Sequence, residues 1–397
     1  MMKARARFAT LSLLVVAVVV GATVLVAAGR GDEAGEDSLY KHLTIFSEVF
    51  GLVRQAYVEE TEAETLLLGA YEGAADALDA FSVYVPADAA AEYRTSRESP
   101  RANGGLFLVR DRGWLYVAGV LEGSPAERAG IERGDVVARV ADRSTRDLDV
   151  WRLQAELARR AVTGTPVELE LLRRGERQIV ELDLAPFEVP AIARETVDGV
   201  PLLRAVTFGP GAAPAWRGAL ESLGAEGATR VLVDLRGAAS EEVEGAFAIA
   251  DLFGAGVLGS LQRRGVVVET FEDREAPVWE GEVVVLIDRG TLGAGELLAK
   301  ILQGTAGARL VGESTYGWAG HRDTMELRSG ALLLITDGFY AGPDGEVIDA
   351  SLEPDYEIRD LWRRIGNRDK TIDDLILERG LEVLRGEVQV EAEAAAA

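Results

Sequence analysis

Blocks of apolar and polar residues succeed one another along the chain, and the first block is a long uncharged run. Residues 8–28 carry no charge, and three basic residues, Lys3, Arg5 and Arg7, precede them. A run of this length can cross a bilayer, and basic residues ahead of it place the N-terminus in the cytoplasm. We therefore expect a cytoplasmic segment at 1–7, a single-pass anchor in the inner (cytoplasmic) membrane, and a folded periplasmic remainder. Cleavage at the end of the run is the alternative.

The next block, residues 31–102, has the three- and four-residue apolar spacing of helices. One such stripe consists of Leu43, Phe46, Val49, Phe50 and Val53. Thr61 and Glu64 have the spacing of a capping box, which predicts the start of a second helix. A third, short helix is expected from about Asp88, because Pro86 ends the segment before it.

Short strands are predicted throughout residues 103–186. The expected strands are GLFLVRD, WLYVAGV, DVVARV, PVELELLRRG and RQIVELDL, with glycine-containing turns between them. A single amphipathic helix is expected from Asp147, with Val150, Leu153, Leu157 and Ala161 on one face. This pattern predicts a small domain in which one helix packs on a sheet.

Strands and helices alternate in residues 187–358, which indicates a layered α/β domain. The expected strands are TRVLVDLRG, GEVVVLIDRG and ARLVGE, with helices over 243–253 and after Gly295. Residues 359–397 are expected to form a charged C-terminal helix and a disordered tail. The fold class predicted for the whole chain is therefore α/β (α+β multidomain), with a helical N-terminal segment, an inserted strand-rich domain and a layered core.

Composition narrows the function classes. The formal net charge of −24 argues against nucleic acid as a partner, because phosphates need a basic surface. The chain has no cysteine, which excludes disulfides, thiolate nucleophiles and cysteine-ligated metals. Only His42 and His321 could supply imidazole, so we expect no histidine-rich metal site and no metal or organic cofactor.

General sequence motifs contribute little. A GAGVLG match at 254–259 follows a predicted helix and not a strand, so we interpret it as a helix-ending loop and not as a dinucleotide site. A Ser-His-Asp triad would have to use His321, which we expect to be an exposed loop residue. The turn at 291–295 lies between a predicted buried strand and a helix, where a nucleophile often stands, yet it contains none except Thr291.

The segment GGLFLV favours a peptide-binding groove. Its glycines open a loop just before a strand, where backbone N–H groups can bind a carboxylate and the strand edge can accept a peptide. A plain β-hairpin with a glycine turn is the alternative. The residues expected to form the groove come from this loop and strand and from the facing helix: Gly104, Gly105, Leu106, Phe107, Leu108, Val150, Leu153 and Leu157.

The order of these segments resembles the carboxyl-terminal processing proteases, serine peptidases of the S41 type with a PDZ domain. GSPAERAGIERGDVVARV is similar to the PDZ motif, VLVDLRG to the Leu-Asp-Leu-Arg strand, and LVGESTYG to the Gly-x-x-Thr-Phe-Gly strand and turn. LLLITDGFYAGPDGEVID followed by EPDYEI resembles the C-terminal block of the family. The resemblance implies a PDZ domain at 103–186, an S41-like core at 187–358, binding of protein or peptide C-termini, and assembly into a homo-oligomer.

The resemblance fails at the catalytic positions. Aligned on Glu296, the family's nucleophilic serine falls on Gly293, its lysine base on Trp318 and a following glutamine on Arg322. The oxyanion-hole segment is replaced by GAAS at 237–240. Glycine cannot attack a carbonyl, and an indole cannot accept the serine proton. We expect no intact catalytic site, and we hypothesise that Trp318 fills the space of the lysine.

Three functions remain open from the sequence. The first is a membrane-anchored pseudoenzyme that binds C-termini or partner proteins through its PDZ domain. The second is an active serine endopeptidase with relocated residues, for which Ser240 and Ser314 are candidate nucleophiles and Lys41, Lys300 and Lys370 candidate bases. Lys300 follows Glu296 at an ion-pair spacing on one helix face, which makes it an unpromising base. The third is a structural assembly protein with a degenerate groove.

Overall fold

The computed structural model describes residues 39–98, 104–111, 113–146, 148–188, 190–273, 276–359 and 370–387. The chain divides into two compact units, residues 1–73 and 74–397. In the first unit, a helix over 39–56 is followed by most of α2 (Ala63–Asp76). Large apolar side chains of the 39–56 helix, such as Leu43 and Val49, are about half exposed.

The predicted membrane anchor is not supported. Residues 8–28 lie outside the described residues, and within the ranges given above no helix is both long enough and apolar enough to cross a bilayer. The prediction of a single-pass inner-membrane protein with a periplasmic folded part is therefore wrong.

The PDZ-like domain is an antiparallel sheet in the order β2-β3-β4-β6-β7, with β5 paired to β4. Its leucine and valine side chains form a core of their own around Leu153, Leu157 and Leu169. The predicted helix begins at Val150 with Asp149 as N-cap, later than expected, and Asp147 lies outside the described residues. The elements are β2 (Leu106–Asp111), β3 (Trp114–Val120), α4 (Pro125–Arg128), β4 (Val136–Val140), β5 (Arg143–Ser144), α5 (Val150–Thr163), β6 (Val167–Arg173) and β7 (Glu176–Leu182).

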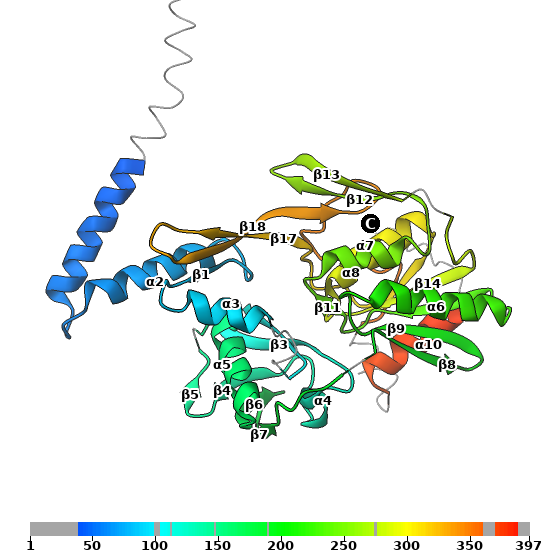
Figure 1. Ribbon diagram of the computed structural model, residues 1–397, viewed down its shortest axis with the longest axis horizontal. Coiled ribbons are helices and arrows are strands. Elements are labelled where there is room, and N and C mark those ends of the chain that lie inside the picture. Colours follow the sequence, from blue (N-terminus) through cyan, green and yellow to red (C-terminus); the bar gives the residue numbers. More distant parts are fainter. Residues whose placement is uncertain are drawn as a thin grey trace, which may run out of the picture. The chain divides into compact units, whose positions relative to one another are not determined.

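The layered core is built on a six-stranded sheet in the order β19-β16-β14-β10-β9-β8. Figure 1 labels β8, β9 and β14 of this sheet and the helices α6, α7, α8 and α10. All pairs are parallel except β8 with β9. Alternate residues of its buried strands face opposite layers: Val285 packs with α6, α7 and α8, whereas Leu286 packs with α10. The elements are β8 (Ile192–Val197), β9 (Val200–Ala205), α6 (Ala212–Ala225), β10 (Arg230–Asp234), α7 (Val243–Ala250), β14 (Glu282–Ile287), α8 (Ala294–Thr305), β16 (Arg309–Gly312), β19 (Tyr356–Glu357) and α10 (Ile372–Arg385).

A second, antiparallel sheet was not anticipated from the sequence. It runs β1-β18-β12-β13, with β17 also paired to β18, and so joins a strand from residues 31–102 to strands of the core. Two short strands, β11 and β15, form a separate parallel ladder. Strand β15 is part of the turn at 291–295. Helix α3 precedes the PDZ-like domain. The elements are β1 (Val83–Val85), α3 (Ala90–Glu98), β11 (Ala239–Ser240), β12 (Gly256–Arg263), β13 (Val266–Asp273), β15 (Leu292–Gly293), β17 (Gly320–Glu326) and β18 (Leu332–Ala341).

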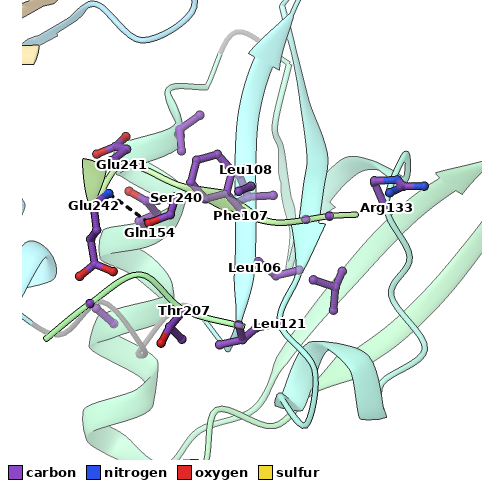
Figure 2. Close-up of a pocket in the computed structure, with 18 of the residues that line it drawn as sticks. Leu106, Phe107, Leu108, Leu121, Arg133, Gln154, Thr207, Ser240, Glu241 and Glu242 are labelled. Atoms are coloured by element: carbon purple, nitrogen blue, oxygen red, sulfur yellow. Dashed lines mark hydrogen bonds between the residues drawn. The ribbon is translucent and has the colours of Figure 1, made fainter. Parts of the chain in front are cut away.

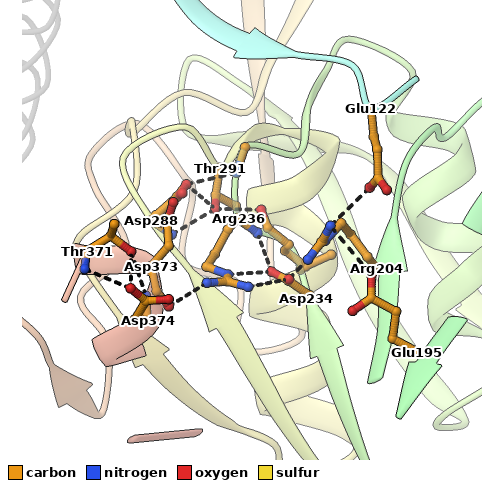
Figure 3. Close-up of polar contacts among 12 residues, drawn as sticks. Glu122, Glu195, Arg204, Asp234, Arg236, Asp288, Thr291, Thr371, Asp373 and Asp374 are labelled. Atoms are coloured by element: carbon orange, nitrogen blue, oxygen red, sulfur yellow. Dashed lines mark hydrogen bonds and ion pairs between the residues drawn. The ribbon is translucent and has the colours of Figure 1, made fainter. Parts of the chain in front are cut away.

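Charged side chains at the ends of β9 and β10 link the core to the PDZ-like domain (Figure 3). Asp234 is fully buried and binds Arg204 at 3.0 Å and Arg236 at 2.7 Å. Arg204 also binds Glu122 of the PDZ-like domain at 3.0 Å, and Arg236 donates to the Asp373 carbonyl at 2.7 Å. Burial alone would raise the pKa of Asp234, but the hydrogen bonds and charge of Arg236, with Arg204, outweigh it and lower the pKa.

The substitution Gly245→Ala in α7 tests how closely the helices α6, α7 and α8 pack on the core. A Cβ atom there would lie 1.7 Å from the Phe208 carbonyl oxygen, so Gly245→Ala should lower the free energy of unfolding by about 1–3 kcal/mol or more. Gly218 in α6 is the matched control, because its Cβ would meet no atom within 4 Å. Gly218→Ala should stabilise the protein by about 0.5–1 kcal/mol. Urea unfolding measures both, and equal effects of the two changes would contradict the packing described.

Asp234→Asn tests the buried ion network. Removing the charge leaves two arginines facing a neutral amide, so stability at pH 7 should fall by about 3 kcal/mol or more. The lowered pKa in the folded state stabilises the wild type at any pH above the ordinary aspartate value, about 3.9, and this stabilisation is lost as the pH falls further. The variant has no carboxylate at this position, so its free energy of unfolding should not show this loss at low pH. Urea unfolding between pH 7 and pH 3 measures it, and parallel pH profiles would contradict the network.

Candidate functional site

The structure brings together the two positions where the family's dyad would stand. Gly293 ends β15 at the N-terminus of α8, and Trp318 lies just before β17. The Gly293 N–H donates a hydrogen bond to the Trp318 carbonyl oxygen at 3.1 Å. The strand-turn-helix unit therefore has the shape of a catalytic turn, with no hydroxyl and no amine at its two central positions.

Backbone pairing closes the space in front of Gly293. Ser240 of β11 pairs with Gly293 of β15, and a Cβ atom at Gly293 would lie 2.2 Å from the Ser240 carbonyl oxygen. Gly293 also has φ of +63°, a backbone conformation that residues with a side chain rarely adopt. Both constraints exclude any larger residue unless the ladder moves.

A buried carboxylate holds this turn in place. Glu296 accepts hydrogen bonds from the Gly317 N–H at 2.5 Å, the Trp318 N–H at 2.9 Å and the Gly293 N–H at 3.1 Å, and also from the Thr315 hydroxyl. Burial raises the pKa of Glu296 above its usual range, although these hydrogen bonds act in the opposite direction.

The expected ion pair with Lys300 does not form, because Lys300 binds Asp344 and Glu346 instead.

The Trp318 side chain is buried and stacked. It is 6% exposed, and its ring lies 3.8 Å from the Phe81 ring at an interplanar angle of 17°. Its indole nitrogen has no hydrogen-bond partner among the described residues. Trp318 thus occupies this position through apolar packing and not through a polar contact.

Arg322 belongs to an ion cluster. It binds Glu241 at 2.6 Å, and Arg97 of α3 binds the same carboxylate at 3.0 Å. Glu241 follows the 237–240 segment directly, so the cluster ties that segment to β17 and α3. At this position the chain has a structural ion pair in place of a hydrogen-bonding glutamine.

The candidate serines have hydrogen-bond partners other than Lys300 and Lys370, and the third candidate base, Lys41, belongs to the first unit. The Ser240 hydroxyl accepts from the Glu242 N–H at 3.0 Å, and Ser314 donates to Glu353 at 2.8 Å. Of the candidate bases, Lys300 is paired as described above, and Lys370 binds Glu378 at 2.5 Å. Both serines therefore have the local structural roles of loop hydroxyls.

His321 is placed differently from the sequence expectation. It is half-buried in strand β17 and not exposed in a loop, and its Nδ1 lies 2.6 Å from Asp337 of β18. No group of three or more His, Asp or Glu side chains that could hold a metal occurs in the described ranges.

A large open cavity of about 2270 Å³ lies between the PDZ-like domain and the core. Figure 2 shows Leu106, Phe107 and Leu108 of β2 on one wall, with Gln154 of α5 and the Ser240 region close by. β2 is the terminal strand of its sheet in the described part of the chain. An extended peptide could add to such a strand.

Five of the eight predicted groove residues line this cavity: Gly105, Leu106, Phe107, Leu108 and Val150. Leu153 and Leu157 do not, because both are fully buried in the core of the PDZ-like domain. Gly104 is buried against Leu182 and Leu184, and its carbonyl oxygen accepts from the Ala126 N–H at 2.9 Å. These three residues are therefore reassigned from the groove to the domain's interior.

The sequence analysis missed the cavity-facing side of α5. Gln154 and Ala158 follow Val150 at intervals of four residues and line the cavity. The helical period could have revealed them, but the strongest apolar stripe of α5 is the one buried in the domain. Thr207 and Glu242 of the core also line the cavity, and no sequence motif singled them out.

Comparison with known proteins identifies two domains. A family model described as peptidase family S41 matches residues 200–358, and a PDZ domain model matches residues 116–173. The carboxy-terminal processing protease CtpA of Bacillus subtilis is 26% identical over 347 residues, covering 85% of this chain and 73% of the relative. A carboxy-terminal-processing protease of Bartonella bacilliformis is 23% identical, covering 86% and 80%.

A solved structure, the photosystem II D1 C-terminal processing protease, has the same fold. Its TM-score is 0.64 at 19% identity, over 79% of this chain and 92% of the other. The S41 match contains the Gly293 turn and Trp318, and the PDZ match contains most of the sheet beside the cavity. The order of these domains and the match along most of the chain make this protein a member of the carboxyl-terminal processing protease family, with an S41-type core and a PDZ domain.

Proposed function

We propose that this chain binds exposed C-termini of proteins or peptides through its PDZ domain and does not cleave them. The observation that carries the proposal is the closed packing at Gly293. A serine hydroxyl there would have to displace the Ser240 carbonyl oxygen, which lies 2.2 Å from the position of a Cβ atom. A Ser-Lys mechanism also needs an uncharged amine beside that hydroxyl, and Trp318 supplies only an indole.

The groove supports the binding half of the proposal. We place the peptide along β2, the terminal strand of its sheet in the described part of the chain, with Val150, Gln154 and Ala158 of α5 along the same cavity. Small and apolar residues predominate on these two elements, which favours an apolar side chain at the end of the bound peptide. A backbone hydrogen bond stabilises the loop at Gly105: the Gly105 carbonyl oxygen accepts from the Leu121 N–H at 2.8 Å.

The first test follows binding and cleavage in the same sample. The protein from residue 31 onward is incubated with an unstructured protein that ends in an apolar residue, and with the same protein carrying a C-terminal amide. We expect binding of the free carboxylate form, weaker binding of the amide and no cleavage of either. Ala158→Arg should abolish binding by filling the groove. Ile179→Arg is the control, because Ile179 is 69% exposed on β7 and does not line the cavity.

Cleavage by the wild type would contradict the proposal. Loss of that cleavage in Ser240→Ala or Ser314→Ala would then establish the alternative, an active serine endopeptidase with relocated residues. The double change Gly293→Ser, Trp318→Lys is not expected to create activity, since the serine side chain would meet the Ser240 carbonyl oxygen. Absence of both binding and cleavage would favour a purely structural protein.

We also propose that the 39–56 helix pairs with a second copy of this chain. Its apolar residues Leu39, Leu43, Phe46, Phe50 and Val53 alternate at intervals of four and three, the heptad spacing of a coiled coil. Leu39, Leu43 and Phe46 are 58%, 51% and 42% exposed in the single chain. A seam of this kind gains stability when a partner helix covers it.

Sedimentation velocity on the Leu43→Lys, Phe50→Lys double variant tests this pairing. We expect the wild type to sediment as a dimer or larger oligomer and the variant as a monomer, because two charges in the seam would be desolvated on pairing. Glu48→Lys on the same helix lies outside the heptad positions and should leave the assembly unchanged. A monomeric wild type would contradict the proposal.

A further inference from the structure

Trp318 belongs to an apolar cluster that also contains residues of the PDZ domain. It shares a buried apolar cluster with Phe81, Leu292 of β15, Val109 of β2 and Ala118 of β3. The last two residues belong to the PDZ sheet, so the side chain at the former base position lies in the contact between the two domains. Every one of the five side chains is less than a tenth exposed.

The peptide-binding strand β2 therefore lies between two apolar layers. Leu106 and Leu108 face the PDZ core, whereas Phe107 and Val109 belong to the Trp318 cluster. This alternation is the period-two pattern of a strand that is covered on both faces. Removing the cluster would leave one face of β2 without support, although the PDZ core itself would be unchanged.

Further contacts hold the same domain, in addition to the pair of Arg204 with Glu122. Trp151 of α5 is 4% exposed, its ring meets Tyr93 of α3 edge-on at 6.2 Å, and it packs with Leu332 and Leu334 of β18. On the opposite side, Arg133 of the PDZ domain forms an ion pair with the buried Asp288. These contacts limit how far the domain can rotate, and none of their residues belongs to the Trp318 cluster.

Close backbone packing surrounds the ion pair. Asp288 accepts from the Gly237 N–H at 2.9 Å and the Gly290 N–H at 2.8 Å. A Cβ atom at Gly290 would lie 2.9 Å from the Ala118 carbonyl oxygen, and one at Gly119 would lie 3.0 Å from the Gly237 carbonyl oxygen. Strand β3 therefore approaches the core loops closely on the side where Ala118 enters the Trp318 cluster.

We propose that Trp318 is an interdomain anchor: its stack with Phe81 holds β2 and β3 of the PDZ domain against the core and so positions the peptide groove. The position that aligns with the family's base thereby has a docking role. The cavity has walls from both domains, with β2 and α5 on one side and Thr207 and Ser240 on the other. A domain that is held in one orientation presents these walls together, which reduces the ordering cost of binding.

The anchor can be tested without any peptide. Because the chain has no cysteine, Ile179→Cys on β7 and Val266→Cys on β13 place one spin label on each domain. Both positions are exposed, at 69% and 63%. Pulsed electron paramagnetic resonance spectroscopy then measures the distribution of distances between the two spin labels. We expect a narrow distribution in the otherwise wild-type protein, loss of that narrow distribution in Trp318→Ala, and its recovery in Trp318→Phe, which can still stack on Phe81.

Trp279→Ala is the matched control. Trp279 is also buried, at 4% exposure, and its indole nitrogen also lacks a hydrogen-bond partner in the described ranges, but it belongs to the core cluster. The control should lower thermal stability without broadening the distance distribution. A distribution in Trp318→Ala as narrow as in the wild type, or equal broadening in both variants, would overturn the anchor.

Peptide affinity provides a second readout, which rests on the proposed function. We expect Trp318→Ala to bind an apolar C-terminal peptide about tenfold more weakly than the wild type, and Trp318→Phe to restore binding. If the wild type binds no peptide, the proposed binding function fails while the distance measurement still decides on the anchor. If peptide binds equally well to every variant, the anchor does not position the groove.

Discussion

The buried carboxylate of Glu296 is the contact on which the centre of this molecule depends. It accepts hydrogen bonds from the Gly293 turn and from Gly317 and Trp318, so one side chain satisfies backbone donors of two segments that are distant in sequence. A buried donor without a partner is costly, which makes the carboxylate hard to replace. The strand-turn-helix unit consequently keeps its shape although the residues at its two central positions cannot perform acyl transfer.

The packing that stabilises this fold does not depend on which residues stand at positions 293 and 318, so the fold can form with glycine and tryptophan there. The parallel sheet, its helical layers and the network around Asp234 depend on burial and on paired charges, and none of these needs a reactive hydroxyl. The space that a lysine would occupy is filled by a large ring stacked on Phe81. Burial of that ring supports the fold and simultaneously brings the PDZ sheet into contact with the core.

Sequence patterns predicted most of the elements that build the site. The strand periodicity around VLVDLRG and the apolar run before Asp288 indicated β10 and β14, because both are buried on two faces. Anchoring on Glu296 also predicted which positions would meet, and Gly293 and Trp318 do lie together. The antiparallel sheet escaped prediction because β12 pairs with β18, a strand distant in sequence, and because exposed valines such as Val266 in the β12–β13 hairpin do not show an inward face.

Contacts between domains could not be predicted in the same way. The stripe of Leu153 and Leu157 is the strongest on α5, yet it faces the domain's own core, and the cavity side is marked only by Gln154 and Ala158. The pairing of Arg133 with Asp288 joins residues far apart in sequence, and no local pattern predicts such a partner. The sequence similarly placed His321 in a loop, because nothing near it identifies Asp337 as its neighbour.

The pairing of β11 with β15 limits which residues the chain can accept at its central turn. A single change to serine at Gly293 would place a Cβ atom 2.2 Å from the Ser240 carbonyl oxygen, so it would destabilise the fold unless the ladder opened. A serine-lysine pair would therefore need a shift of the backbone as well as the replacement of Trp318 by lysine. The two short strands thus couple the identity of one residue to the position of a neighbouring backbone segment, and a change of side chain at position 293 is also a change of backbone structure.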